Sequence, residues 1–202
     1  ADGAVGGGIL DLFANGYFQR EGNIYNAPGA SGVGLEATGG VISDYADSGT
    51  IYRAHTFTAS GAFEVTKLST DLPGGDDLEY LVVAGGGGGG GGYYGGGGGA
   101  GGLRTNLSGH PLATGNPSFT VTAGPTSYTV TIGGGGAPGM FPGSPNNGLD
   151  AGQGVDSYFG PPSTPEGILS KGGGKGMGRG TSASSETDGY PGGSGGGIAY
   201  RG

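Results

Sequence analysis

Two histidines, His55 and His110, are the residues of this sequence best suited to hold a metal ion or move a proton. His55 stands in an alternating run between Ala54 and Thr56, and His110 stands in the loop-like stretch Ser-Gly-His-Pro-Leu. A protein zinc site needs three or four nitrogen, sulfur or oxygen ligands at characteristic spacings. Two distant histidines without cysteines or matching acidic residues do not supply them. We therefore expect no metal, no cofactor and no catalytic residue.

Other motifs with chemical potential are equally incomplete. Asp76 and Asp77 follow Pro-Gly-Gly, but calcium loops alternate their acidic ligands, so this pair is more typical of a turn. Lys171 and Lys175 stand among glycines, yet neither is followed by the serine or threonine that a phosphate loop requires. The stretch Asn106–Ser108 matches the acceptor pattern for N-glycosylation, which indicates a surface loop.

Charge and composition narrow the class of partner. The 202 residues include 8 Lys and Arg against 16 Asp and Glu, a net charge of -8, so we expect neither nucleic acid nor an anionic membrane surface as partner. No apolar stretch approaches the roughly 18 residues that span a bilayer, so we expect no membrane insertion. The chain has no cysteine and begins at Ala1, which predicts a removed leader or a piece of a longer product.

Strand patterns without helical periodicity predict an all-β fold. Residues 54–58 and 62–66 alternate around Ser60-Gly61, which predicts a β-hairpin. Residues 118–133 predict a second hairpin, and Leu-Glu-Tyr-Leu-Val-Val-Ala before the long glycine run predicts a buried strand. The expected fold is a β-hairpin sandwich or jelly-roll-like domain with glycine-rich, polyproline-II-like layers.

Glycine accounts for 57 residues, and most stand in blocks that follow strands. Ordering glycine carries the largest entropy loss of any residue, and neither helix nor packed strand offsets it well. Extended threefold segments laid side by side can instead satisfy every backbone group, and only glycine permits the close approach. We expect a glycine sandwich; long surface loops are the alternative. The candidate rods are residues 85–92, 95–102, 133–136, 172–174 and 192–197.

Side chains that interrupt such rods stand out at the rod ends. Tyr93 and Tyr94 separate two glycine runs, where rigid amphipathic rings suit recognition of a glycan or a protein surface. Capping of the hydrophobic core is the alternative role for them. The turns around Phe141 and around Tyr158–Phe159, together with the loop of His110, are the other expected recognition sites.

Residues 1–38 form an expected N-terminal arm ahead of a glycine-rich β domain at residues 39–202. The arm holds the densest apolar cluster of the first third, and it could donate a strand to the next subunit or pack on its own core. A head-to-tail contact that does not close produces an open filament. The assembly residues would be Ile9, Leu10, Leu12, Phe13, Tyr17 and Phe18.

Several longer motifs carry a family resemblance. The stretches Tyr-Arg-Ala-His-Thr-Phe-Thr at 52–58, Gly-Gly-Leu-Arg-Thr-Asn-Leu-Ser-Gly-His-Pro-Leu at 101–112 and Ser-Tyr-Thr-Val-Thr-Ile at 127–132 stand in order within residues 39–202. This part resembles the glycine-rich domain of virion structural and tail-fibre-like proteins of cyanobacterial bacteriophages. The resemblance implies a non-enzymatic, self-associating component of a virion or an extracellular fibre. The alternative is an adhesin that binds a host-surface glycan through its rod-end loops.

Overall fold

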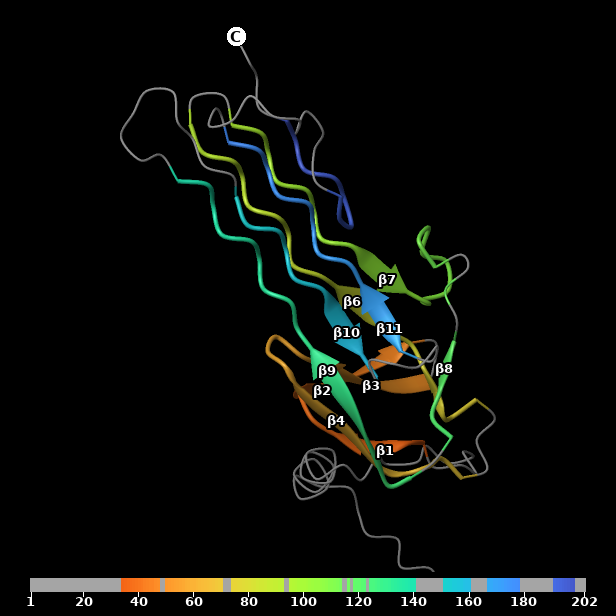
Figure 1. The fold of residues 1–202 in the computed structure, drawn as a ribbon. Coiled ribbons are helices and arrows are strands. Elements are labelled where there is room, and N and C mark those ends of the chain that lie inside the picture. Colours follow the sequence, from red (N-terminus) through yellow and green to blue (C-terminus); the bar gives the residue numbers. More distant parts are fainter. Residues whose placement is uncertain are drawn as a thin grey trace, which may run out of the picture.

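The fold is taken from a computed structural model that describes residues 34–47, 50–70, 74–92, 95–113, 116, 118–122, 124–140, 151–160, 167–178 and 191–198. Figure 1 shows two regions: β-strands gather at one end, and nearly parallel zigzag segments extend from them to the other. The described elements are all strands, joined in antiparallel pairs, so the predicted all-β class is confirmed. The described residues include no helix long and apolar enough to cross a membrane.

A five-stranded antiparallel sheet forms the centre of the strand region, in the order β1-β4-β9-β10-β11. Its strands are β1 (Glu36–Thr38), β4 (Gly61–Lys67), β9 (Thr126–Thr131), β10 (Ser157–Phe159) and β11 (Ile168–Ser170). β1 pairs with β4, so the sheet includes the last residues of the segment predicted as an arm.

Three two-stranded ribbons complete the strand region. β2 (Val41–Asp47) pairs with β3 (Thr50–Thr56), β5 (Asp77–Leu78) with β8 (Phe119–Thr120), and β6 (Leu81–Val83) with β7 (Leu103–Thr105). β6 lies close to β10 and β11, which brings this ribbon onto the central sheet.

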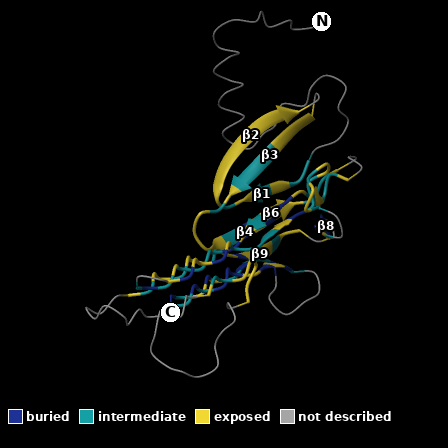
Figure 2. Cartoon of the chain, turned by 90° about the horizontal axis from the view of Figure 1, so that it is seen from above, coloured by how far each residue is buried: buried dark blue, intermediate teal, exposed yellow. Residues whose placement is uncertain are grey.

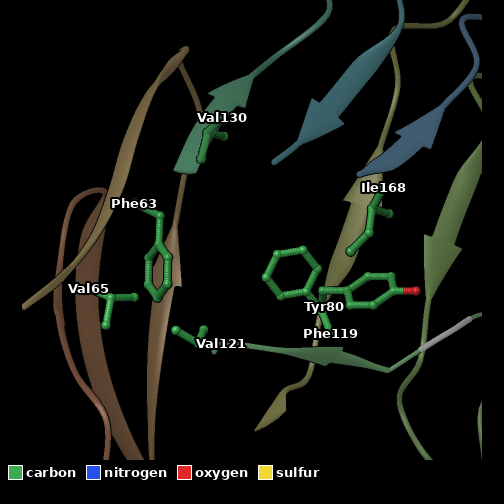
Figure 3. Packing of buried hydrophobic residues seen from close by; sticks show 7 residues of the cluster. All are labelled: Phe63, Val65, Tyr80, Phe119, Val121, Val130 and Ile168. Atoms are coloured by element: carbon green, nitrogen blue, oxygen red, sulfur yellow. The ribbon is translucent and has the colours of Figure 1, made fainter. Parts of the chain in front are cut away.

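The hydrophobic core lies between the central sheet and the short ribbons (Figure 3). Alternate residues of β4 supply Phe63 and Val65, as expected for a strand with one face buried. Aromatic rings meet edge-on or tilted, for example Phe119 with Phe159 at 4.9 Å between centroids. The buried cluster is Phe63, Val65, Tyr80, Phe119, Val121, Val130 and Ile168.

Both predicted hairpins are wrong in their pairing, although their strands exist. β3 pairs with β2, and β4 lies between β1 and β9. β8 likewise pairs with β5, whereas β9 pairs with β4 and β10. The predicted buried strand is also interrupted, because β5 ends at Leu78 and β6 begins at Leu81.

The glycine runs form six extended rods, which we number in chain order. Rods 1 and 2 are residues 84–92 and 95–102, rods 3 and 4 are residues 132–140 and 151–156, and rods 5 and 6 are residues 171–178 and 191–198. Their mutual backbone hydrogen bonds recur at every third residue: Ala84, Gly87 and Gly90 donate to Gly102, Gly99 and Gly96 at 2.8–3.0 Å. Three residues is the period of a polyproline II helix, so the expected glycine sandwich is present.

The rods pack as two layers of three. One layer has the order rod 3, rod 1, rod 2 and the other the order rod 4, rod 5, rod 6, with hydrogen bonds within and between the layers. Rods 1 and 5 lie in the middle, and each bonds to four neighbours. In the view of Figure 1 the two layers overlap, and Figure 2 shows buried and exposed residues recurring along the rods.

Each of the first five rods continues a strand, and the strand register continues with it. Leu81 lies opposite Thr105 and Val83 opposite Leu103; one step on, Ala84 bonds to Gly102 and Gly87 to Gly99. The β9–β10 and β10–β11 pairs pass into rods 3, 4 and 5 in the same way. The side-chain-rich strands therefore fix the alignment of rods that have almost no side chains.

Candidate functional site

The interior positions of the rods have no room for a side chain. A Cβ atom on Gly85 would lie 2.0 Å from the carbonyl oxygen of Gly134, and one on Gly87 would lie 2.1 Å from that of Gly174. Both obstacles are backbone atoms, which cannot rotate away. Glycine is required here because neighbouring rods approach until their peptide groups touch.

Outward positions of the rods behave differently, and they explain where the glycine runs are interrupted. A Cβ on Gly89 would have its nearest neighbour at 3.9 Å, and a Cβ on Gly97 would have none within 4 Å. Ala100 stands three residues after Gly97, on the same side of rod 2 by the three-residue period. The non-glycine residue therefore falls where the lattice is open.

A polar cluster joins the central sheet to the rods. The Asp156 carboxylate accepts hydrogen bonds from Lys171 Nζ at 2.7 Å and from the Gly172 backbone N–H at 2.8 Å. These donors hold the pKa of Asp156 below its usual range. The Ser157 hydroxyl accepts a bond from the Gly133 N–H at 2.9 Å. Rods 3, 4 and 5 are thus tied together where they leave β9, β10 and β11.

The far end of the sandwich brings together the ends of rods 1, 2, 3, 5 and 6. Gly90 bonds to Gly96 near the ends of rods 1 and 2, and Met177 in rod 5 bonds to rod 6 through Gly197. Met140 and Ile198 lie at the ends of rods 3 and 6 and are 65% and 59% exposed. Two large apolar side chains are therefore exposed at this end of the sandwich. Tyr93, Tyr94 and Phe141 themselves lie outside the described residues.

The other predicted recognition residues lie in the strand region. Tyr158 and Phe159 belong to β10 at the base of rod 4, so their expected placement in a rod-end turn is wrong. Phe159 packs on the core rings, and the buried Tyr158 hydroxyl has no hydrogen-bond partner among the residues that the structure describes. Burial raises the pKa of Tyr158. His110 lies in a turn, where its backbone N–H donates to the Leu107 carbonyl at 3.1 Å. A role of these residues in recognition stays a prediction.

A mostly apolar pocket of about 430 Å³ opens beside the core, at the base of the β2–β3 ribbon. His55 lines it from β3, with its ring edge-on to Phe63 at 5.0 Å and its Nδ1 2.8 Å from the Gly39 carbonyl. Leu81 lines it from β6 and is 56% exposed. The other lining residues are Thr56, Phe57, Phe63, Leu78, Tyr80, Val82, Val83, Val130, Thr131, Ile132, Tyr158 and Phe159.

The β2–β3 ribbon projects from the body, and β2 is coloured as exposed along its length (Figure 2). All residues of β2 are exposed, and large apolar residues lie on both faces of the ribbon. On one face the Tyr45 and Tyr52 rings stack at 5.4 Å. The other face carries a bidentate pair, in which Arg53 donates twice to Asp44 at 2.8 Å and lowers the pKa of that carboxyl. Sequence reasoning missed this surface.

The predicted assembly residues lie outside the described part of the chain. They are Ile9, Leu10, Leu12, Phe13, Tyr17 and Phe18. The arm joins the structure at Gly34, directly before β1.

The incomplete motifs of the sequence make structural hydrogen bonds where they fall within the described residues. Asp76 accepts a bond from the Ser69 N–H at 2.7 Å, and Asp77 accepts one from the Thr120 hydroxyl. The Asn106 side chain accepts a bond from the Tyr80 N–H at 2.8 Å and donates one to the Leu78 carbonyl at 2.9 Å. The stretch 106–108 lies in a loop after β7 in which Ser108 is exposed, as the sequence predicts. Across the described residues, no group of three or more histidine or acidic side chains could hold a metal ion.

One Gly-x-Ser-x-Gly pattern, at residues 192–196, resembles the nucleophile elbow of hydrolases. Ser194 instead belongs to a rod: its N–H donates to the Ala100 carbonyl and its carbonyl accepts from Gly174, both at 2.9 Å. The surroundings are extended rods, whereas the elbow needs a sharp strand-to-helix turn. The pattern here follows from glycine content.

Comparison with known proteins identifies the family but no individual relative. A family model described as a glycine-rich domain matches residues 58–202, so the chain belongs to that family. The matched part begins just before β4 and includes all six rods, whereas β1, β2 and β3 lie ahead of it. No curated protein and no solved structure matches the chain.

Proposed function

We propose that the protein is a non-enzymatic structural subunit that assembles with copies of itself into an extracellular fibre or appendage. The observation that carries this proposal is the rod lattice. Peptide groups of six rods bond to one another at 2.7–3.1 Å, and five of these rods continue strand ladders without a change of register. Such a body is stiff along its length, and its interior backbone is withdrawn from water and from proteases.

A virion appendage, specifically a tail-fibre-like part of a bacteriophage of cyanobacteria, is the finer form of this proposal. It is supported by the motif resemblance within residues 39–202, and the family of glycine-rich domains is compatible with it. In this setting the protein would act outside cells, and its partners would be copies of itself.

Negative-stain electron microscopy tests the structural proposal. The full chain is imaged beside a chain that lacks residues 1–18 and a full-length control in which Ile9, Leu10, Leu12 and Phe13 are serine. We expect filaments of uniform width from the full chain and none from the two variants, because the apolar arm makes the joint. Discrete particles of one size in all three samples, at every protein concentration, would refute self-assembly.

A second function, receptor binding, is favoured by the far end of the sandwich. Met140 and Ile198 are exposed there, at the ends of rods 3 and 6, and in the sequence Tyr93 and Tyr94 stand between rods 1 and 2. In an adhesin, changing Tyr93 and Tyr94 together to alanine abolishes binding to host-surface glycans. Changing Tyr45 and Tyr52 to alanine is the matched control, because that pair is exposed at the opposite end. Equal binding by both variants on a glycan array would exclude the tyrosine turn as the binding site.

A further inference from the structure

The β2–β3 ribbon has a surface that the described residues leave uncovered. We call the outer edge of β2, together with the exposed apolar side chains on the two faces of the ribbon, the docking edge. One face carries Val41, Tyr45 and Tyr52, and the other carries Ile42 and Ile51. The two faces follow from the register: Ile42 lies opposite His55 and Ala46 opposite Ile51, whereas Tyr45 lies opposite Tyr52. Among the described residues, β2 bonds only to β3.

A ribbon of this kind gains little stability by itself. Two-stranded hairpins without a third strand or a covering element are marginal in water. Val41 is 69% exposed and Tyr45 is 50% exposed on one face, while Ile42 and Ile51 are 44% and 46% exposed on the other. Clusters of exposed apolar side chains on a strand edge mark sites where another chain adds a strand.

The sequence of the N-terminal arm fits this edge. Residues 9–13 read Ile-Leu-Asp-Leu-Phe, so a strand there would place Leu10 and Leu12 on one face and Ile9, Asp11 and Phe13 on the other. The leucine face is wholly apolar and the other face carries Asp11 between two apolar side chains, so the strand offers apolar contacts to both exposed faces of the ribbon. Five residues span roughly 17 Å, which is within the length of β2.

We propose that residues 9–13 of a second copy add to the docking edge as a third strand. The strand would bond to β2 through its backbone, the mode known as β-augmentation. Its leucines would extend the face that carries Ile42 and leads to the pocket beside His55, and Phe13 would lie on the face of the stacked tyrosines. This inference names the contact that joins subunits, so it rests on the proposed self-assembly.

The chain's own geometry permits exchange between copies. Residues 14–35 connect the donor strand to β1, and a fully extended segment of that length reaches roughly 75 Å. The receiving ribbon begins just after β1, so each copy would carry both a donor and an acceptor. Donation from one copy to the next does not close by itself, which produces an open chain of subunits.

Cysteine cross-linking tests the contact, because the protein contains no cysteine of its own. One sample of the full chain carries Asp11→Cys, a second carries Ser43→Cys in β2, and a third carries Val155→Cys, which is 55% exposed on rod 4. A short bismaleimide is added to mixtures of the first with the second and of the first with the third. We expect a cross-linked heterodimer from the first mixture only.

Two further measurements complete the test. Replacing Leu10 and Leu12 by serine in the Asp11→Cys chain should lower the yield about tenfold, since a loss of 1.4 kcal/mol in binding is tenfold in affinity. A chain that carries both Asp11→Cys and Ser43→Cys can be cross-linked within itself at high dilution. If that chain is cross-linked and the mixture of single-cysteine chains is not, exchange between copies would be overturned. Filaments without the Asp11–Ser43 cross-link would overturn the docking edge but keep the proposed function. The cross-link without filaments would support the docking edge and refute the fibre. If neither the cross-link nor filaments form, both proposals are refuted.

Discussion

Alanine at Gly87 tests whether the rods are packed through their backbones. Gly87 lies in the middle of rod 1, and its N–H donates to the Gly99 carbonyl at 2.8 Å. The added Cβ would lie 2.1 Å from the Gly174 oxygen of rod 5, whereas ordinary contact begins near 3.4 Å. Rods 1 and 5 must therefore separate by more than about 1 Å, because close-packed interiors have no space to absorb the clash.

The size of the effect follows from the bonds that this separation stretches. Rods 1, 2 and 5 meet at Gly87 through bonds of 2.8 Å, including Gly99 to Gly174 and Gly173 to Gly85. A hydrogen bond contributes about 0.5–1.5 kcal/mol net, and overpacking costs about 1–3 kcal/mol. We expect Gly87→Ala to lower the free energy of unfolding by about 3 kcal/mol or more, and Tm by roughly 6–12 °C.

Gly89→Ala is the matched control, since it makes the same chemical change two residues along the same rod. Its Cβ would have 3.9 Å of clearance, so restriction of the unfolded chain leaves it neutral or stabilising by about 0.4–1 kcal/mol. Guanidinium unfolding followed by tyrosine circular dichroism gives both values. Equal stabilities for Gly87→Ala and Gly89→Ala would refute close rod packing.

Two further predictions concern polar groups of the strand region. Hydrogen bonds to Arg53 and Lys171 lower the pKa values of Asp44 and Asp156 in the folded protein. The two carboxylates therefore stabilise the fold fully above their unfolded pKa of about 4, and this contribution is lost as the pH falls through the lower folded values. Unfolding measured from pH 6 to pH 2 should show this loss, and a double Asp→Asn variant should show a flatter profile; parallel profiles would contradict the linkage. Tyr158→Phe removes a buried hydroxyl without a partner, so we expect no loss of stability and a gain of up to about 1 kcal/mol, whereas a loss above about 1 kcal/mol would reveal a hydrogen bond of that hydroxyl.

The glycine lattice is the part of the fold that the sequence predicts best. A run such as residues 85–92 has no side chains to bury, so ordered backbone pairing is the one interaction left to it. The order of rods in the layers is beyond such reasoning, because the runs are nearly identical. Their register is set by the strands that lead into them, for example β6 and β7 into rods 1 and 2.

The strands show the opposite pattern: their positions are predictable but their partners are not. Alternation in β4 marks Phe63 and Val65 as buried, yet it contains no information on which strand lies alongside. The expected partner β3 is adjacent in sequence, but β4 has both edges occupied by β1 and β9. Packing of the core between segments far apart in the sequence decides which strands pair with β4, and a local sequence pattern contains no information on it.

The docking edge was missed although its signal is present. Residues 41–47 and 50–56 both contain β-branched and aromatic residues around Asp-Ser-Gly, a hairpin signal. The acidic residues Asp44 and Asp47 weaken this hairpin signal, because charged residues in a short segment usually favour the prediction of a loop. Arg53 opposite Asp44 explains how one of these charges is accommodated.

Hydrogen exchange of the glycine-rod amides tests the central claim most directly. Mass spectrometry of the intact chain after deuteration and rapid digestion compares peptides from rods 1 and 5 with peptides from β4 and β9. The account predicts that amides such as Gly87 and Gly173 exchange as slowly as those of the central sheet, because they are bonded between buried rods. Complete exchange of the rods within seconds, with the sheet still protected, would contradict a backbone-paired scaffold.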